Sequence, residues 1–165
     1  MAALSTACQN GRFALGPTDR VEKLYSDITR ISIMANSPLL DVDYDSNPDG
    51  VFVRVYLYRQ GPIKPVGGQG SITFHLISRR KDAQGAFVDK DLKTWQVSQQ
   101  TMTQALNRDR FGQVCYEMEL YWPGLQFGET EIYIRGEFVR PDGKICQSRP
   151  LSLIRAPAPP GQARH

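Results

Sequence analysis

The stretch Val51-Phe-Val-Arg-Val-Tyr-Leu-Tyr58 decides the fold prediction, because aliphatic residues alternate in it with aromatic or charged ones. Successive side chains of a β-strand point to opposite faces of the sheet, so a period of two indicates a strand with one buried face. The aliphatic side chains fall on one face, which we expect to point into the core: Val51, Val53, Val55 and Leu57.

The same period of two recurs along the middle of the chain. Further strands are predicted around residues 31–33, 72–76, 95–97, 114–120, 132–138 and 144–154. Turn sequences rich in Gly, Pro and Asp separate them, at 47–50, 67–68, 82–85, 123–124 and 141–143. Seven short strands without long helices predict an all-β fold, a two-sheet antiparallel sandwich in immunoglobulin-like or fibronectin-like order. A partly closed barrel is the alternative.

Two short helices are expected beside the strands. Thr18 is suited to cap a helix over residues 18–28, whose apolar side chains recur at three- and four-residue spacing. Ser98 is suited to cap a second helix over residues 98–108, with Met102, Ala105 and Leu106 facing inward.

The chain has 165 residues, a length that favours one domain with a sizeable core. We place this sandwich domain at residues 18–155. Residues 1–17 are small and polar without periodicity, which predicts a flexible N-terminal segment. Residues 156–165 hold three of the eleven prolines and little to bury, which predicts a disordered, Pro-rich tail.

Composition excludes some classes of function. The net charge is only +3, from 20 basic and 17 acidic residues, which argues against a nucleic-acid binder. The longest basic cluster, Arg79-Arg80-Lys81, is followed at once by Asp82 and is typical of a solvated hairpin. No apolar run approaches the roughly 18 residues that a membrane helix needs.

Three cysteines are too few for a disulfide framework. Small residues directly precede Cys8, as they do at the lipid-modified cysteine of bacterial lipoproteins, so Cys8 is a candidate lipid attachment site. The same segment also fits a plain disordered N-terminus. Cys115 and Cys146 fall in predicted strands that are not neighbours in an immunoglobulin-like order, which favours free thiols over a disulfide bond.

An acidic loop precedes the decisive strand. Its carboxylates are candidate Ca²⁺ ligands, because Ca²⁺ prefers six to eight oxygens at short range. As an EF-hand loop the segment fails, since Ser46 stands where glycine is needed and Phe52 where glutamate is needed. A polar crossover loop that collects aspartates for their turn-forming side chains is the alternative. The candidate ligands are Asp41, Asp43, Asp45 and Asp49.

Catalytic signatures are missing. His75 is the only histidine outside the tail, and its place in the middle of a strand is typical of a surface histidine rather than a general base. The chain shows neither a Gly-x-Ser-x-Gly elbow nor a Cys-x-x-Cys pair, so nothing in the sequence supports an enzyme.

Phe52, Tyr56 and Tyr58 form an aromatic row on the outward face of the decisive strand. An exposed row of this kind suits protein contact or stacking on sugar rings, so these residues are a candidate contact face. The alternative is that one of the predicted helices covers the row.

The layout of residues 28–153 resembles a group of uncharacterised bacterial envelope and lipoprotein domains. The shared marks are the acidic loop ending at Asp49-Gly50, Trp95 before a polar helix, Leu120-Tyr-Trp122-Pro123 and Pro141-Asp142-Gly143. The resemblance implies a sandwich fold and an envelope setting, and it carries no activity. We expect a non-catalytic interaction or scaffold module that acts through protein–protein contacts. A ligand-binding module for carbohydrate or Ca²⁺ is the alternative.

Overall fold

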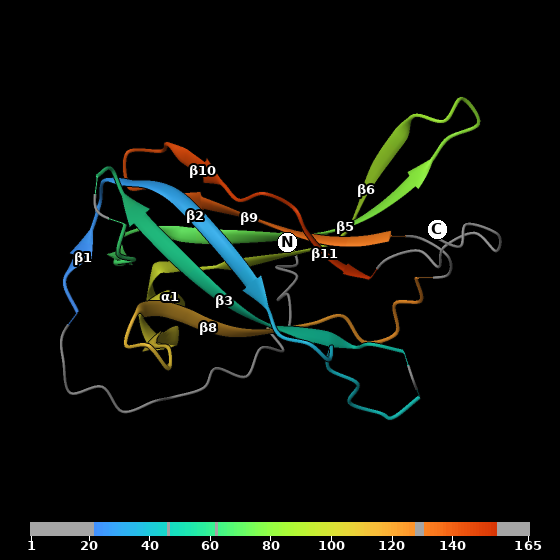
Figure 1. The fold of residues 1–165 in the computed structure, drawn as a ribbon, viewed down its shortest axis with the longest axis horizontal. Coiled ribbons are helices and arrows are strands. Elements are labelled where there is room, and N and C mark those ends of the chain that lie inside the picture. Colours follow the sequence, from blue (N-terminus) through green and yellow to red (C-terminus); the bar gives the residue numbers. More distant parts are fainter. Residues whose placement is uncertain (1–21, 46, 62, 128–130, 155–165) are drawn as a thin grey trace, which may run out of the picture.

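The computed structural model describes residues 22–45, 47–61, 63–127 and 131–154, and they form two antiparallel sheets packed face to face (Figure 1). The first sheet has the order β2 (Ile28–Ala35), β3 (Gly50–Arg59), β8 (Val114–Tyr121), β7 (Leu106–Arg108). The second has the order β10 (Ile145–Gln147), β9 (Glu131–Val139), β5 (Ser71–Lys81), β6 (Phe87–Val97), and β11 (Leu151–Ile154) also pairs with β9. The all-β sandwich prediction is confirmed.

The order of the strands within the two sheets resembles that of an immunoglobulin-like sandwich. Taken in their order across the sheet, β2, β3, β8 and β7 correspond to strands A, B, E and D of such a domain. The second sheet corresponds to strands G, F and C, with β6 added beside C. The two sheets leave an open seam where the edge strand β2 lies next to β10 and β11.

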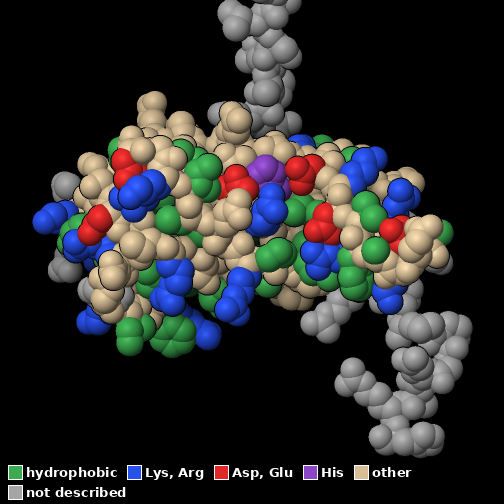
Figure 2. Space-filling model, turned by 90° about the horizontal axis from the view of Figure 1, so that it is seen from above, with side chains coloured by type: hydrophobic (Ala, Val, Ile, Leu, Met, Phe, Trp, Pro, Cys, Tyr) green, Lys and Arg blue, Asp and Glu red, His purple; other side chains and the backbone are tan. Residues whose placement is uncertain are grey.

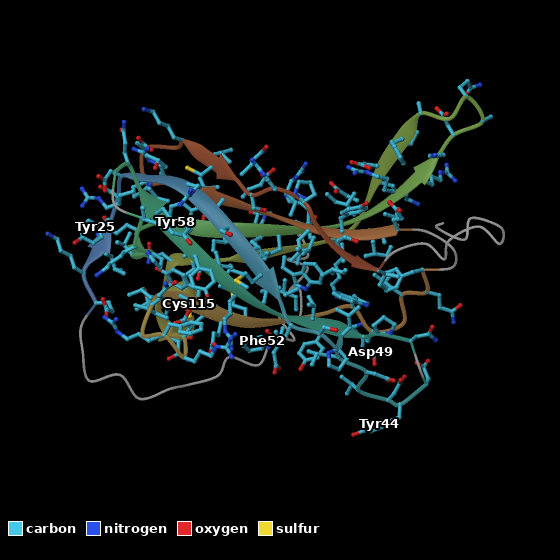
Figure 3. All side chains as sticks on the ribbon, viewed as in Figure 1. Tyr25, Tyr44, Asp49, Phe52, Tyr58 and Cys115 are labelled. Carbon is cyan, nitrogen blue, oxygen red and sulfur yellow. The ribbon has the colours of Figure 1, made fainter. Side chains whose placement is uncertain are left out.

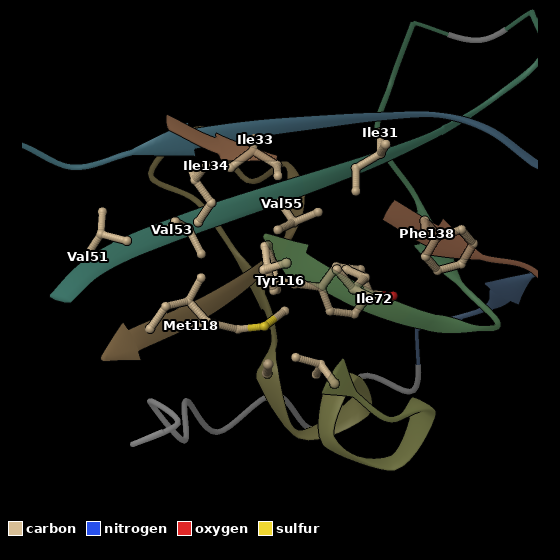
Figure 4. Close-up of a cluster of buried hydrophobic side chains, with 14 of the residues drawn as sticks. Ile31, Ile33, Val51, Val53, Val55, Ile72, Tyr116, Met118, Ile134 and Phe138 are labelled. Atoms are coloured by element: carbon tan, nitrogen blue, oxygen red, sulfur yellow. The ribbon is translucent and has the colours of Figure 1, made fainter. Parts of the chain in front are cut away.

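The core lies between the sheets and is built from their inward faces (Figure 4). All four aliphatic residues of β3 are fully buried there, as their alternation predicts. They pack with side chains of the other sheet such as Ile72, Ile134 and Phe138. Burial of each such aliphatic side chain stabilises the fold by about 1.5 to 3 kcal/mol.

The helix predicted over 98–108 is shorter in the structure. It forms α1 (Gln99–Ala105), and the Oγ of its cap Ser98 accepts a hydrogen bond from the Thr101 N–H at 3.2 Å. Met102 and Ala105 are buried in the core as predicted, whereas Leu106 already begins β7. The helix carries the chain from one sheet to the other.

The helix predicted over 18–28 is wrong within the described part, which begins at residue 22. Leu24 and Tyr25 form β1 (Leu24–Tyr25), which pairs in parallel with β4 (Gly67–Gly68). The Leu24 side chain lies so close to Gly67 that a β-carbon there would be 2.8 Å from it. This partner lies more than forty residues away, so local periodicity did not reveal it. The predicted segments 1–17 and 156–165 lie outside the described residues.

Several strands differ in length from the prediction, and the last predicted strand and β6 bear on the sites described below. The single last strand over 144–154 is divided into β10 and β11. The Ser148 N–H still donates to the Gly136 carbonyl at 2.8 Å, in the register of β10 with β9, and β11 resumes the pairing one residue out of that register after Arg149 and Pro150. Proline interrupts the ladder there because it has no N–H to donate. The Gly136 N–H donates in return to the Ser148 Oγ at 2.9 Å. Strand β6 is longer than the predicted 95–97, and together with β5 it forms a hairpin that projects from the sandwich (Figure 1).

Within the described residues, we find no helix with the length and apolar character that crossing a membrane requires.

Candidate functional site

Three of the four candidate Ca²⁺ ligands converge in the loop between β2 and β3. One carboxylate oxygen from each of Asp41, Asp43 and Asp49 lies within 4.8 Å of the others. Asp45 is not part of this group, and its carboxylate instead accepts hydrogen bonds from the backbone and side chain of Asn47. The acidic loop therefore gathers three carboxylates at a spacing that suits one cation.

The loop is fixed on its Asp49 side. The Asp49 carboxylate is 8% exposed and accepts a hydrogen bond from the Val42 N–H at 2.9 Å. The backbone of Leu40 pairs with that of Asp49 and Gly50, which closes the base of the loop. Figure 3 shows Asp49 near the sheets and the exposed Tyr44 at the far end of the loop. One ligand is thus held rigidly and the others lie on an exposed segment.

The electrostatics of the loop favour a bound cation. A hydrogen bond from the Asp45 backbone lowers the pKa of Asp43, but partial desolvation and repulsion from the carboxylates of Asp45, Asp49 and Asp41 raise it more, and the net shift is upward. A raised carboxyl pKa in a crowd of like charges means that the charged form is disfavoured. A cation among these carboxylates would remove that cost.

The aromatic row does not form an open platform. Tyr56 is only 6% exposed, and its hydroxyl donates to the Asp109 carboxylate at 3.0 Å. Phe52 and Tyr58 are half-buried, and the guanidinium groups of Arg54 and Arg30 lie over their rings, at 5.4 and 4.2 Å from the ring centroids. Among the described residues, no helix covers the row, because α1 contacts β5 and β8 and its buried side chains lie in the core.

His75 lies in β5 between two carboxylates on the outer face of the second sheet. Its Nδ1 is 3.6 Å from an Asp91 oxygen and its Nε2 is 3.6 Å from a Glu137 oxygen. Figure 2 shows the histidine at the surface with acidic side chains beside it. The cluster was not predicted, since it arises from the register of β5 with β6 and β9. The thiols that a nucleophilic site would need lie elsewhere, on β8 and β10.

Cys115 and Cys146 are free thiols, as favoured from the sequence. Burial raises the pKa of Cys115 to about 11, with smaller contributions from the carboxylates of Glu117 and Asp109. A buried thiol with a raised pKa is a poor nucleophile. Cys146 is partly buried, and its Sγ donates to the Ile28 carbonyl at 3.3 Å. The candidate lipid attachment site Cys8 lies outside the described residues.

A cleft of about 570 Å³ opens at the seam between the two sheets, and sequence reasoning missed it. One wall is the edge strand β2, and the other is the segment that links β10 to β11. The cleft depends on the break of the last strand at residues 148–150, which alternation in the sequence does not show. An Arg-Pro pair next to a serine was the available signal, because proline cannot donate to a strand ladder.

Comparison with protein-family models, with curated proteins and with solved structures found no match to this chain.

Proposed function

We propose that the chain is a non-catalytic interaction or scaffold module of the bacterial cell envelope that acts through protein–protein contacts. The envelope setting is supported by the sequence resemblance and by the small residues before Cys8. The contact itself is best supported by the hairpin of β5 and β6, whose outer part, residues 80–88, we call the arm. The arm, rather than the partly covered aromatic row, carries the proposal.

The arm extends beyond the described part of the strand that supports it. Among the described residues, β9 pairs with β5 as far as Arg79, which lies opposite Glu131, the first described residue of β9. Beyond that point, the described residues of β5 and β6 pair only with each other, as Lys81 does with Phe87. A two-stranded ribbon without a packed face is marginally stable in water. The arm therefore gains stability when a partner covers it.

The arm exposes apolar side chains at its tip. Phe87 is 63% exposed and Val88 is 41% exposed, next to the charged side chain of Lys81, whose Nζ lies 5.4 Å from the Phe87 ring centroid. Aromatic residues are enriched in protein interfaces. The tip has the composition of a contact site rather than of a plain turn.

The base of the arm is rigid. Arg79 donates two hydrogen bonds to the Asp89 carboxylate, at 2.7 and 2.8 Å, and its guanidinium lies 4.6 Å from the Tyr133 ring centroid. The turn is closed by Asp82, whose Oδ1 accepts from the N–H groups of Gln84 and Ala86. A fixed base and a closed turn present Phe87 in one orientation, which lowers the entropy cost of binding.

The test compares two exposed phenylalanines. Phe87→Ser changes the arm, and Phe111→Ser makes the same change at a residue that is 73% exposed outside the arm. Proteins retained by each variant from an envelope extract of the native host are quantified by mass spectrometry. A protein retained by the wild type and by Phe111→Ser, but lost with Phe87→Ser, supports the proposal. The same set retained by all three chains contradicts it.

The proposed lipid tether has a separate test. The intact mass of the chain purified from its native host reports any modification at Cys8. A chain that begins at Cys8 with the added mass of a diacylglycerol supports a tethered module. An unmodified chain that retains the residues before Cys8 contradicts the tether and leaves the arm contact to its own test.

Ca²⁺ binding by the acidic loop is a second candidate function, favoured by the convergence of three carboxylates within 4.8 Å. A bound ion would stabilise the folded chain by mass action. Carbohydrate binding, the other alternative, gains no comparable support, because Tyr56 is buried.

A further inference from the structure

The seam cleft lies against the free edge of strand β2. Its described lining residues include Ile31 and Ile33 of β2, Tyr58 of β3, and Arg149 and Pro150 from the segment before β11. Strand β2 ends the order of its sheet, so it has a neighbouring strand in that sheet on one side only. Across the seam, the edge of the second sheet is interrupted between β10 and β11.

The pairing register shows which backbone groups face the cleft. The N–H of Asn36 donates to the Phe52 carbonyl at 3.0 Å, so residue 36 makes a hydrogen-bonded pair with β3. Hydrogen-bonded and non-hydrogen-bonded pairs alternate along an antiparallel ladder. Ile31 and Ile33, opposite Leu57 and Val55, therefore direct their N–H and C=O groups away from β3, toward the free edge. The cleft offers these groups a place for another strand.

The charge of the cleft is uniformly basic. Its described lining holds two arginines, Arg30 and Arg149, and no aspartate or glutamate. Neither guanidinium has a carboxylate partner among the described residues, whereas Arg54, Arg59, Arg79, Arg108, Arg135 and Arg140 each have one. The Arg30 guanidinium lies 4.2 Å from the centroid of the Tyr58 ring, which also lines the cleft. Paired arginines without acidic neighbours are suited to carboxylate groups.

Away from the cleft, side chains of the protein itself cover the edge of β2. At the start of β2, the Ile28 carbonyl accepts hydrogen bonds from the Arg140 guanidinium at 3.3 Å and from the Cys146 Sγ at 3.3 Å. Such cover protects a sheet edge against unwanted pairing. This cover is at Ile28, whereas the lining of the cleft begins at Arg30. The edge of β2 is thus covered at one end and open beside Arg30 and Arg149.

We propose that the seam cleft binds an extended acidic segment of a partner protein, which adds as a strand to the edge of β2 and places its carboxylates on Arg30 and Arg149. Backbone hydrogen bonds to Ile31 and Ile33 supply strand pairing, and the arginines supply selectivity for acidic sequences. The inference rests on the proposal that the chain is an interaction module, but the cleft is a different site from the arm.

The test uses a fluorescein-labelled peptide, Val-Glu-Val-Glu-Val-Glu, and measures its binding by fluorescence anisotropy at low salt. We expect saturable binding that weakens by about tenfold or more when Gln replaces Glu in the peptide, and by a similar factor in the double variant Arg30→Gln, Arg149→Gln. Arg110→Gln removes the same charge at an exposed arginine outside the cleft and is expected to leave the affinity unchanged. An unchanged thermal midpoint in each variant shows that the fold is intact.

Two N-methylated peptides separate strand addition from simple anion binding. Each carries methyl groups on alternate backbone amides, in one register or the other, so that only one of them loses the donors that face β2. Loss of binding in one register supports strand addition. Equal binding of both, equal binding of the Gln peptide, or no binding of the acidic peptide up to about 1 mM overturns the proposal. Phe87→Ser is expected to bind the peptide normally, so failure here is distinguishable from failure of the arm contact.

Discussion

The backbone N–H of Trp122 donates a hydrogen bond to the Asp49 carbonyl at 2.6 Å, which ties the end of β8 to the end of the acidic loop. The indole of Trp122 is fully buried, and its Nε1–H donates to the Pro48 carbonyl. Its ring also packs against Trp95 and Phe127, with centroids 6.2 and 5.8 Å away. One core residue therefore fixes the loop that holds the candidate Ca²⁺ ligands.

Replacement of Trp122 by Phe removes the donor to Pro48 and leaves a cavity beside Trp95. We expect the free energy of unfolding to fall by about 2 to 4 kcal/mol, from the unpaired carbonyl and the lost volume together. Urea unfolding followed by circular dichroism measures the change. Trp95→Phe is the control, because Trp95 is only partly buried, and a loss as large as that of Trp122→Phe would contradict the anchoring role.

Calcium binding predicts different effects for two neighbouring aspartates. Millimolar Ca²⁺ should raise the thermal midpoint of the wild type by a few degrees, and chelator should reverse the rise. Asp43→Asn removes one of the three convergent carboxylates and should abolish most of the Ca²⁺-dependent rise in the thermal midpoint. Asp45→Asn makes the same charge change outside the three convergent carboxylates and should retain the rise. A wild type that does not respond to Ca²⁺, or equal losses in the two variants, would exclude the site.

The two described thiols should differ in reactivity. Burial raises the pKa of Cys115 to about 11, and Cys115 is fully buried, so little thiolate is present and reagent has no access. In a Cys8→Ser background at about pH 8, we expect a thiol reagent to modify Cys146 slowly and Cys115 only in denaturant. Mass spectrometry of the labelled peptides measures this. Rapid labelling of Cys115 in the native chain would contradict its complete burial in β8.

Asp109 should make stability depend on acid pH. Partial burial raises its pKa, but hydrogen bonds from the N–H groups of Gln113 and Phe111 and from the Tyr56 hydroxyl lower it more, so the net shift is downward from 3.8. A group with a depressed folded-state pKa stabilises the fold above its unfolded value, and the contribution is lost as pH falls through the folded value. We expect Asp109→Asn to cost about 1 to 2 kcal/mol at neutral pH.

The same variant should show a smaller loss of stability than the wild type when the pH falls below about 4, because the titrating group is absent. Unfolding free energies of the wild type and of Asp109→Asn at a series of pH values measure the difference. Parallel pH profiles for wild type and Asp109→Asn would show that the hydrogen bonds of Asp109 do not stabilise the folded state.

The sandwich was predictable because alternation is local and each sheet buries one face. The valines of β3 show this, since every one is fully buried. Tyr56 shows the limit of predicting burial from alternation. Its outward side chain is buried and donates a hydrogen bond to Asp109, which lies 53 residues away in the sequence. The helix predicted around Leu24 was wrong for a related reason, because the pairing of β1 with the glycines of β4 overrides the helical spacing of the sequence.

The candidate sites likewise divide into those that the local sequence predicts and those that depend on contacts between distant residues. The acidic loop was visible as a run of aspartates, and the structure adds only which three converge and that Asp45 does not. The neighbours of His75 depend on the registers of β5, β6 and β9, which alternation leaves undetermined. The seam cleft depends on the break of the last strand between Ser148 and Leu151, for which the Arg149-Pro150 pair was the only signal in the sequence.

Photo-cross-linking in the native host tests the central claim of a partner contact at the arm most directly. A benzophenone-bearing phenylalanine is placed at position 87 in one chain and at position 111 in another, both exposed aromatic sites. We predict one dominant cross-linked partner from position 87, with little of it from position 111. Equal adducts from the two positions, or none from position 87, would contradict an interaction module that works through the arm.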